Sequence, residues 1–221
     1  MLVAGVDEAG RGCVIGPLVV AGVAVKSENL QLLINLGVKD SKLLTPKKRE
    51  ALYPEILKLC ALHHIIKVPP YIIDKAVRNI RTLHKLNRLE ARTMAKIIEM
   101  LQPDKAFVDA ADVVHERFGE HIQECLTKKT VIVSEHKADR NYIVVSAASV
   151  IAKVERDGEI HRLHEKYGDF GSGYLTDDKT LGFLRRLLDE GSGFYPGCVR
   201  KSWEPARRVK AEYGTEQKTL V

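Results

Sequence analysis

The segment from residue 3 to residue 25, VAGVDEAGRGCVIGPLVVAGVAV, constrains the fold of this chain more than any other. It holds two valine-rich runs, at residues 2–8 and 16–25, on either side of a glycine-rich turn, and this pattern predicts a β-hairpin. The uncharged stretch 12–25 is broken by two glycines and a proline, and it is too short to span a bilayer. We therefore expect the hairpin to be buried in a globular core and expect no transmembrane helix.

The overall charge favours a polyanionic partner. The 221 residues carry a formal net charge of +6, and the pI is about 9.1. Nucleic acid is the first candidate, and a solvated basic surface without a partner is the alternative. Apolar residues make up 45% of the chain, and at this length that is enough for a sizeable single-domain core.

The cysteines and the N-terminus bear on the compartment. Cys13, Cys60, Cys125 and Cys198 are widely spaced and form no CxxC pair, which predicts reduced thiols and no zinc site. No basic region precedes the first apolar run, which meets an acid at Asp7, so we predict no signal peptide. The expectation is a cytoplasmic protein without membrane contact, and a monomer by default.

Hydrophobic periodicity predicts the remaining elements. Thr45 and Pro46 are typical of an N-cap and a first helical position. Strands are expected at residues 62–68, 105–109 and 130–134, and helices at 85–101, about 114–126, about 145–167, and from a cap at Thr176 towards Glu190. A meander followed by strand–helix–strand units predicts a mixed α/β sheet.

Acidic side chains stand at three predicted strand ends. Asp7 and Glu8 close the first strand, Asp109 ends the strand KAFVD, and Asp139 follows the strand TVIVS. Four carboxylates gathered at one edge of a sheet would repel one another unless a cation lay between them. Oxygen ligands suit Mg²⁺ or Mn²⁺. Taken singly, each acid is more often a solvated strand end or a helix cap, but the tandem pair with two more favours a metal site.

The tandem pair raises a geometric question. Neighbouring residues on a regular strand point to opposite faces. Asp7 and Glu8 can therefore serve one site only if the strand ends at Glu8 or a bulge turns one of them.

The segment Gly10-Arg11-Gly12 matches neither of the common nucleotide-binding fingerprints, because the glycine spacing is wrong and a strand follows in place of a helix. What remains is a turn whose backbone groups a ligand can approach closely, with Arg11 in reach of a phosphate. An incidental hairpin turn is the alternative.

Six motifs appear in order along the chain. They are Asp7-Glu8-Ala9-Gly10-Arg11-Gly12 with Gly16-Pro17, Lys39-Asp40-Ser41-Lys42, Phe107-Val108-Asp109, His136-Lys137-Ala138-Asp139, Ser146-Ala147-Ala148-Ser149, and Gly171-Ser172-Gly173-Tyr174. Together they resemble ribonuclease HII, the type 2 ribonuclease H, in its archaeal form. The resemblance extends from residue 3 to about residue 203, nearly the whole chain, and six motifs in register make it highly specific.

This resemblance implies a ribonuclease H-like mixed central sheet flanked by helices, with a helical C-terminal extension. We expect a catalytic domain at residues 1–197 and a basic tail or small helical appendage at 198–221. The implied activity is endonucleolytic cleavage of RNA paired to DNA, and nicking 5′ to single ribonucleotides embedded in duplex DNA, with 5′-phosphate and 3′-hydroxyl products. The implied cofactors are two Mg²⁺ or Mn²⁺ ions, which serve the attacking water and the leaving oxyanion.

The resemblance also implies roles for individual residues. Asp7, Glu8, Asp109 and Asp139 match the family's four metal-site acids. Gly10, Arg11 and Gly12 match the turn that contacts the ribose 2′-hydroxyl and the adjacent phosphate, Tyr174 matches the tyrosine that packs on the same sugar, and Lys42 falls where a phosphate-contacting lysine is expected. His136 is a candidate for proton transfer, although a loop histidine is more often polar surface.

The last residues bear on partners. Basic side chains from Arg200 to Lys218, together with Trp203, could hold a duplex backbone, and a packed Trp203 anchoring a solubilising helix is the equal alternative. The chain from Gln217 to Val221 resembles the start of a sliding-clamp-binding box that stops before its two aromatic residues. We therefore expect weak or lost clamp binding.

Two other functions compete with this interpretation. A junction resolvase of the same fold could use similar acids, but sugar discrimination by the glycine turn and Tyr174 would be pointless on DNA junctions. A non-catalytic binder of RNA–DNA hybrids is the second, and a divalent-ion requirement for turnover would separate it from an enzyme. A serine hydrolase is poorly supported, since no GxSxG motif occurs.

Overall fold

The computed structural model describes residues 1–38, 44–81, 83–191 and 193–219. These residues divide into two compact units. The sheet unit comprises Met1–Ala9, Val19–Lys67 and His84–Glu155, and the helical unit comprises Gly10–Leu18, Val68–Leu83 and Arg156–Val221. The domain boundary expected at residue 197 stays a prediction.

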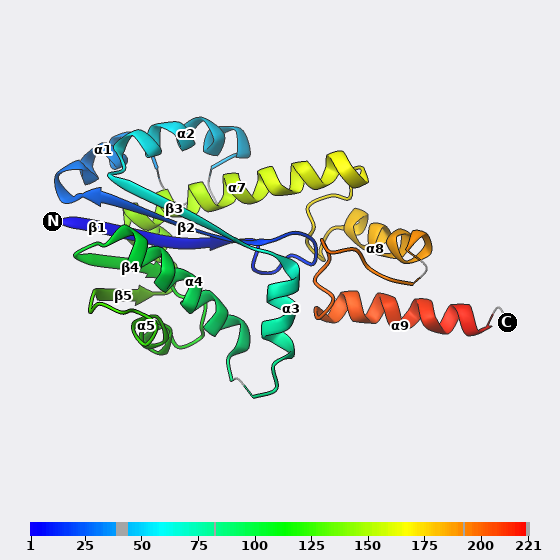
Figure 1. Ribbon diagram of the computed structural model, residues 1–221. Coiled ribbons are helices and arrows are strands. Elements are labelled where there is room, and N and C mark those ends of the chain that lie inside the picture. The colour runs from blue at the N-terminus through cyan, green and yellow to red at the C-terminus, as the bar shows by residue number, and fades with distance from the viewer. Residues whose placement is uncertain (39–43, 82, 192, 220–221) are drawn as a thin grey trace. The chain divides into compact units, whose positions relative to one another are not determined.

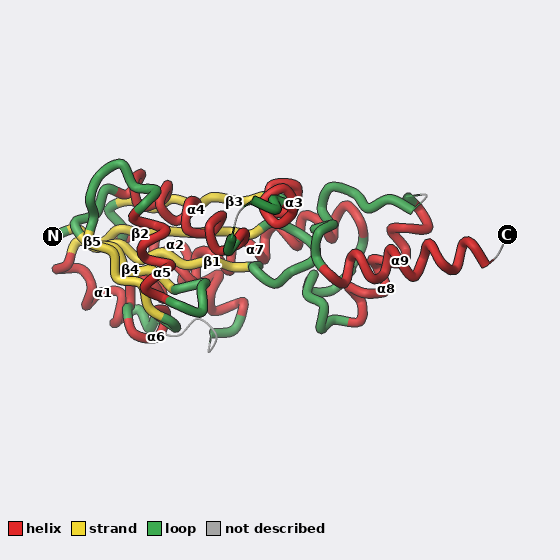
Figure 2. The backbone as a smooth tube through the Cα atoms, turned by 90° about the horizontal axis from the view of Figure 1, so that it is seen from below, coloured by secondary structure: helices red, strands yellow, loops and turns green. Residues whose placement is uncertain are grey.

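The sheet unit is built on five strands in the order β3-β2-β1-β4-β5 (Figures 1 and 2). The strands are β1 (Leu2–Ala9), β2 (Leu18–Lys26), β3 (Leu62–Val68), β4 (Lys105–Asp109) and β5 (Val131–Glu135). β1 pairs antiparallel with β2 and parallel with β4, which in turn pairs parallel with β5. The predicted hairpin and the predicted mixed sheet are thus confirmed.

Helices cover both faces of this sheet (Figure 1). Those of the sheet unit are α1 (Leu30–Asn35), α2 (Pro46–Leu59), α4 (Lys85–Leu101), α5 (His115–Gln123), the short α6 (Ala138–Asn141) and the first part of α7 (Ile143–Tyr167), and a 3₁₀ turn η1 (Ser27–Asn29) precedes α1. The Thr45 hydroxyl accepts the Lys48 N–H at 3.3 Å, so the predicted cap of α2 is confirmed. No helix within the described ranges combines the length and the apolar character that crossing a membrane requires.

Alternation along β1 and β2 assigns residues to the two faces. Val3, Val23 and Val25 share one buried cluster with side chains of α1, α2 and α7. Gly22 lies on the other face, where an added Cβ would meet the Ile97 side chain of α4. The odd-numbered positions of β1, which include Asp7, therefore face α7.

The helical unit contains three helices and the second part of α7, and of these α8, α9 and α7 supply residues to a core of its own. The helices are α3 (Pro70–Arg78), α8 (Asp178–Glu190) and α9 (Glu204–Thr219). Ala206 and Val209 of α9 are buried in that core, and Trp203 packs against it. The predicted helical C-terminal extension is thus present, and the alternative of a packed Trp203 agrees with the structure.

β3 ends at Val68 and Pro70 begins α3, because proline is well suited to the first helical turn. One local prediction needs correction. The cap of α8 is Asp177 and not Thr176, since the Asp177 carboxylate accepts the Lys179 N–H at 3.1 Å.

Gly5 controls how closely α7 approaches β1. A Cβ at this position would lie 2.2 Å from the Val144 backbone carbonyl and 2.5 Å from the Val145 backbone nitrogen. Backbone atoms in a buried helix cannot move aside as a flexible side chain can, so only glycine fits here. The close approach matters for the site, because α7 also carries Ser149 and Lys153.

We predict that Gly5→Ala lowers the free energy of unfolding by roughly 1–3 kcal/mol or more, the usual cost of overpacking a core. For a chain of this size each kcal/mol corresponds to about 2–4 °C in melting temperature. Gly158→Ala is the matched control, because this exposed helical glycine has nothing within 4 Å of an added Cβ, and alanine should stabilise the helix by up to about 1 kcal/mol. Thermal unfolding of both variants checks this. Equal melting temperatures would show that α7 does not depend on Gly5.

Candidate functional site

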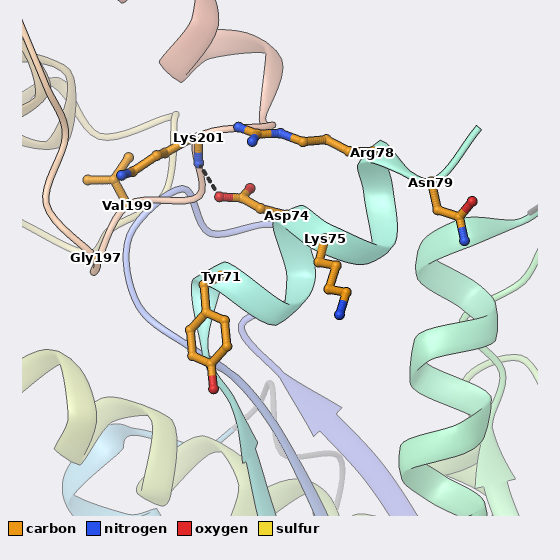
Figure 3. Close-up of a pocket in the computed structure, with 8 residues that line it drawn as sticks. All are labelled: Tyr71, Asp74, Lys75, Arg78, Asn79, Gly197, Val199 and Lys201. Carbon is orange, nitrogen blue, oxygen red and sulfur yellow. Dashed lines mark hydrogen bonds between the residues drawn. The ribbon is translucent and has the colours of Figure 1, made fainter. Parts of the chain in front are cut away.

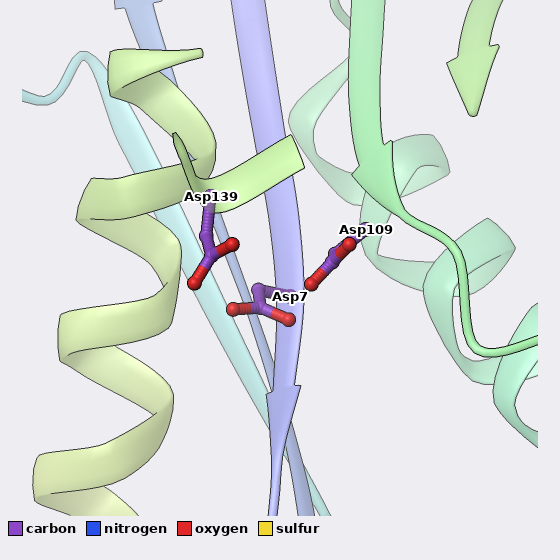
Figure 4. Close-up of side chains that lie close together, drawn as sticks. All are labelled: Asp7, Asp109 and Asp139. Carbon is purple, nitrogen blue, oxygen red and sulfur yellow. The ribbon is translucent and has the colours of Figure 1, made fainter. Parts of the chain in front are cut away.

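Three carboxylates converge on the α7 face of the sheet. Asp7 of β1, Asp109 of β4 and Asp139 of α6 each offer an oxygen, and these atoms lie within 4.8 Å of one another (Figure 4). Asp7 and Asp139 are buried, with relative exposures of 5% and 1%, and Asp109 is half-buried. The structure thus brings together three of the four acids that the sequence singled out.

Sheet register explains why Asp7 and Asp109 meet. β1 and β4 are parallel neighbours in which Val6 pairs with Val108, so the next residue of each strand is an aspartate on the same face. This is the carboxyl end of both strands, where α/β sheets place their sites.

Asp139 reaches the cluster from the chain that follows β5. The Ala138 N–H, at the start of α6, donates to Asp109 Oδ1 at 3.1 Å. The Ser146 hydroxyl of α7 donates to the Asp139 carbonyl oxygen. These two bonds tie α6 both to β4 and to the first turns of α7, and so fix the position of Asp139.

Glu8 is not part of this cluster. Pairing with β2 continues without a break through Asp7–Ala21, Glu8–Val20 and Ala9–Val19. The strand therefore does not end at Glu8, and alternation sends consecutive side chains to opposite faces. A role for Glu8 as a metal ligand stays a prediction.

Burial and charge repulsion act on Asp7 in the same direction. Desolvation, and then the nearby Asp109 carboxylate, raise the pKa of Asp7 from 3.8 to about 7. A hydrogen bond from Ser149, the charge of Lys153 and the Glu8 N–H at 2.7 Å oppose that rise. A carboxyl group with this pKa favours a nearby cation, because the cation would offset both the repulsion and the lost hydration.

Ser149 and Lys153 belong to the site, and only the serine lies in a motif that the sequence singled out. Lys153 Nζ donates to Ser149 Oγ at 2.8 Å, and both side chains act on Asp7. Their separation of four residues places them on one face of a helix. That spacing of two polar residues in a mostly buried helix was the signal that could have identified Lys153.

The cluster fits a hard divalent cation. Its donors are all carboxylate oxygens, which Mg²⁺ and Mn²⁺ accept and zinc rarely selects alone. A cation there would also balance the three charges that repel one another. Asp7, Asp109 and Asp139 are thus the residues that could hold such an ion.

The glycine–arginine turn belongs to the helical unit and is held by a buried arginine. Gly10 has a φ of 81°, a left-handed conformation that favours glycine. The Arg200 guanidinium donates to the carbonyl oxygens of Gly10 at 2.6 Å, Arg11 at 2.8 Å and Gly16 at 3.1 Å. Arg200 is 0% exposed, so it cannot contact a duplex backbone as its place in the basic tail had suggested.

Tyr174 lies beside this turn. A Cβ on Gly12 would be 3.7 Å from the Tyr174 ring. The Arg156 guanidinium lies 4.8 Å from the ring centroid and donates to Cys13 Sγ at 2.9 Å. Burial, and then the nearby Cys13, raise the pKa of Tyr174 to about 12, so its hydroxyl stays protonated at neutral pH.

The remaining candidates are elsewhere or cannot be placed. His136 is exposed, its Nε2 lies 3.1 Å from the Val113 carbonyl oxygen, and it is outside the acid cluster. Lys42 lies outside the described residues, as do the side chains from Gln217 to Val221.

Comparisons with known sequences agree on one family. A model of the family described as Ribonuclease HII matches residues 4–206. The chain is 48% identical to the ribonuclease HII of Cenarchaeum symbiosum over 211 residues, which cover 96% of this chain and 99% of the relative. It is 42% identical to that of Pyrococcus horikoshii over 222 residues, which cover 100% of this chain and 98% of the relative.

Solved structures lead to the same family. The ribonuclease H2 from Pyrococcus horikoshii superposes with a TM-score of 0.88 at 42% identity, covering 97% of this chain and 99% of that one. The structure of the PCNA:RNase HII complex from Archaeoglobus fulgidus superposes with a TM-score of 0.81 at 46% identity, covering 92% of this chain and 96% of that one. Bst-RNase HIII in complex with Mn²⁺, at 20% identity, shares the fold with a TM-score of 0.76, covering 96% and 70%.

We predict that Asp7→Asn stabilises the metal-free protein at pH 8. Folding raises the pKa of Asp7 from 3.8 to about 7, so its contribution to stability is full below pH 3.8 and is lost as the pH rises through about 7. The asparagine removes the charge, so in chelator at pH 8 the variant should melt several degrees above the wild type. The conversion is about 2–4 °C in melting temperature for each kcal/mol in the free energy of unfolding. The difference should shrink as the pH falls towards 4.

Asp189→Asn is the control, because Asp189 is exposed at the end of α8. Adding Mg²⁺ should raise the melting temperature of the wild type more than that of Asp7→Asn. An Asp7→Asn protein that melts at or below the wild-type temperature at pH 8 would contradict the repulsion argument.

Proposed function

The chain belongs to the ribonuclease HII family, and on that premise we propose that it cleaves the RNA strand of RNA–DNA hybrids and nicks duplex DNA 5′ to single embedded ribonucleotides. Members of this family are ribonucleases H, metal-dependent endoribonucleases, and this chain is one of them. The proposal concerns the finer substrate preference, the two-metal mechanism and the residues involved. The cluster of Asp7, Asp109 and Asp139 is the observation that carries it.

In the proposed mechanism these three aspartates would hold the divalent ions. Glu8 would supply a fourth carboxylate only if its side chain turned towards the cluster, because the regular pairing of β1 sends it to the other face. Bound Mg²⁺ or Mn²⁺ supplies Lewis-acid stabilisation at both ends of the displacement. The water oxygen forms the new bond to phosphorus, and the bond from phosphorus to the 3′ oxygen of the preceding nucleotide breaks. In the net reaction a water proton ends on that 3′ oxygen, so the preceding nucleotide carries a 3′-hydroxyl and the ribonucleotide carries a 5′-phosphate.

Ser149 and Lys153 assist by orienting Asp7. The Ser149 hydroxyl bonds the carboxylate, and the Lys153 ammonium lowers its pKa through its charge. Lys153 in turn donates to Ser149, so the serine is fixed from two sides. Together they oppose the rise of the Asp7 pKa and orient its carboxylate, in a buried position where protonation competes with metal binding.

Sugar discrimination is assigned to the turn in the helical unit. The 2′-hydroxyl is the group that distinguishes RNA from DNA at a given sugar. Arg200 occupies the carbonyls of Gly10 and Arg11, so the turn presents a fixed set of backbone groups to a substrate. Arg11 would contact the adjacent phosphate, and the Tyr174 ring beside Gly12 would pack against the ribose.

The test is cleavage of a DNA duplex with one embedded ribonucleotide beside an all-DNA duplex, with Mg²⁺, Mn²⁺ or chelator. We expect a metal-dependent nick 5′ to the ribose, absent from the all-DNA duplex. Asp109→Asn should lower kcat by at least about 10²-fold, because removing a charged ligand weakens transition-state stabilisation. Cleavage of both duplexes would refute the assigned role of the turn, and binding without turnover in any metal would favour a non-catalytic hybrid binder.

In the same assay, Arg200→Lys should reduce the preference for the ribonucleotide duplex, since lysine cannot make three fixed bonds as the guanidinium does. The matched control is Arg207→Lys on the exposed surface of α9, which should behave as wild type. The Mg²⁺ concentration at half-maximal rate should be the same in all three proteins.

The C-terminal segment from Gln217 to Val221 is proposed to make a weak contact with a sliding clamp. The support is the incomplete box in the sequence and the similar chain from Archaeoglobus fulgidus, whose structure is described as a PCNA:RNase HII complex. The 221 residues of this sequence include only the first part of such a box, so a protein of these residues should bind the clamp more weakly than micromolar. Calorimetric titration with the clamp, with Gln217→Ala as the comparison, checks this. Ordinary micromolar affinity, or no effect of Gln217→Ala, would contradict the proposal.

A further inference from the structure

The helical unit contains a cavity with several charged residues in its lining, and none of the proposed roles uses it. Its volume is about 610 Å³, and its wall is formed by α3 and by the chain around Val199 (Figure 3). Three cationic side chains line it, Lys75 and Arg78 from α3 and Lys201 from the other side. We call it the α3 pocket.

Asp74, the acid in the wall of this pocket, is engaged by the protein itself. It is 7% exposed, and its carboxylate accepts the N–H groups of Lys201 at 3.0 Å and Ser202 at 2.8 Å, and the Ser202 hydroxyl at 2.6 Å. Asp74 thus fixes the chain at Lys201 to α3, and three cations against this one carboxylate leave the pocket positively charged.

The chain that Asp74 fixes also holds the glycine turn. Arg200 immediately precedes Lys201 and donates to the carbonyls of Gly10 and Arg11. The Arg200 N–H adds a bond to the Val14 carbonyl at 2.8 Å. A ligand in the α3 pocket would therefore lie at a fixed distance from the turn, because Lys201 is bonded to Asp74 of α3 and its neighbour Arg200 is bonded to the turn.

The lining indicates the ligand's chemistry. Lysine and arginine together bind phosphate oxygens, by charge and by directed hydrogen bonds. Tyr71, which is 67% exposed, and Asn79 add a ring and an amide at the rim, and such groups recur in contacts with nucleic-acid backbones. An acidic peptide would offer single carboxylates, whereas a nucleic-acid strand offers phosphates at regular intervals to a site already registered on the turn.

We propose that the α3 pocket binds a backbone phosphate of the substrate strand and sets the register of the duplex on the glycine turn. This inference rests on the proposed function, since it assumes that the turn contacts a ribonucleotide. The pocket contributes affinity and register without touching the scissile bond. Its loss should raise KM and leave kcat at saturating substrate unchanged.

The experiment is an anisotropy titration of a labelled duplex with one embedded ribonucleotide, in chelator, over a series of salt concentrations. Lys75→Ala/Arg78→Ala should weaken binding by about fivefold or more near physiological salt, and should reduce the slope of log K against log salt by about 1–2. Lys128→Ala/Lys129→Ala, which removes two exposed lysines of the sheet unit, is the control with the same change in net charge. Equal losses in the two double variants, or none in the first, would overturn the proposal.

Cleavage separates failure of the pocket from failure of the proposed function. The pocket variant should keep its metal dependence, its cleavage position and its kcat, with only KM raised. A wild type that neither binds nor cleaves the ribonucleotide duplex would refute the proposed function itself. A wild type that cleaves with a KM equal to that of the variant would refute the pocket alone.

Competition and thermal-shift experiments with other anions identify the ligand that the α3 pocket binds. Inorganic phosphate at millimolar concentration should compete only weakly with duplex binding, and equally in wild type and control. Thermal stabilisation by free phosphate in the wild type and not in the pocket variant, together with unchanged duplex affinity, would assign the pocket to a small anion. Binding of an acidic peptide that needs Lys75 and Arg78, with duplex affinity again unchanged, would assign it to a protein partner. Either result would overturn the nucleic-acid proposal.

Discussion

The carboxylates of Asp7, Asp109 and Asp139 repel one another within 4.8 Å, and the sheet unit holds them there with bonds of its own. The Ala138 N–H restrains Asp109 and the Ser146 hydroxyl restrains the chain at Asp139. Close packing at Gly5 brings α7 against the strand. Since each restraint comes from a different element, the cluster depends on the whole topology of the sheet, and the free energy spent in gathering the charges is available to favour a cation.

A second kind of restraint governs the helical unit, where a positive charge is buried against carbonyl oxygens. Burying a guanidinium is unfavourable unless its donors are satisfied, and the carbonyls of Gly10, Arg11 and Gly16 accept from Arg200. The turn gains a fixed shape from this arrangement. A rigid backbone surface suits discrimination of one hydroxyl group, because a flexible turn could adjust to its absence.

Strong local patterns made most of the fold predictable. The hairpin, the strands at β3 and β4 and the helix at α4 follow from periodicity, and the cap of α2 follows from Thr45 and Pro46. Three of the four acids meet because strand order and register bring them together, and their positions at strand ends had predicted this. Glu8 lies outside the cluster because side chains alternate between the two faces of a regular strand. The sequence already showed this conflict, since Asp7 and Glu8 are adjacent.

The features that sequence patterns could not place depend on long-range contacts. Arg200 resembles the other basic residues of the tail, and only its bonds to carbonyls about 190 positions earlier reveal that it is buried. The spacing of Lys153 from Ser149 indicates a shared helix face, but only the structure shows that Asp7 lies beside both side chains. Composition predicts how much charge a segment carries, but whether a given charge faces water or the backbone depends on which distant segment covers it.

The two units are connected through the elements that carry their functional residues. β1 carries Asp7 and ends at Ala9, and the next residue, Gly10, begins the turn. α7 carries Ser149 and Lys153 towards Asp7, and three residues later the same helix carries Arg156, which contacts Cys13 and Tyr174. Residues of the two groups therefore follow one another along the chain in two places. Ala147 and Ala148 of α7 are buried in the core of the sheet unit, where a larger side chain would disturb the packing that places Ser149 and Lys153 beside Asp7.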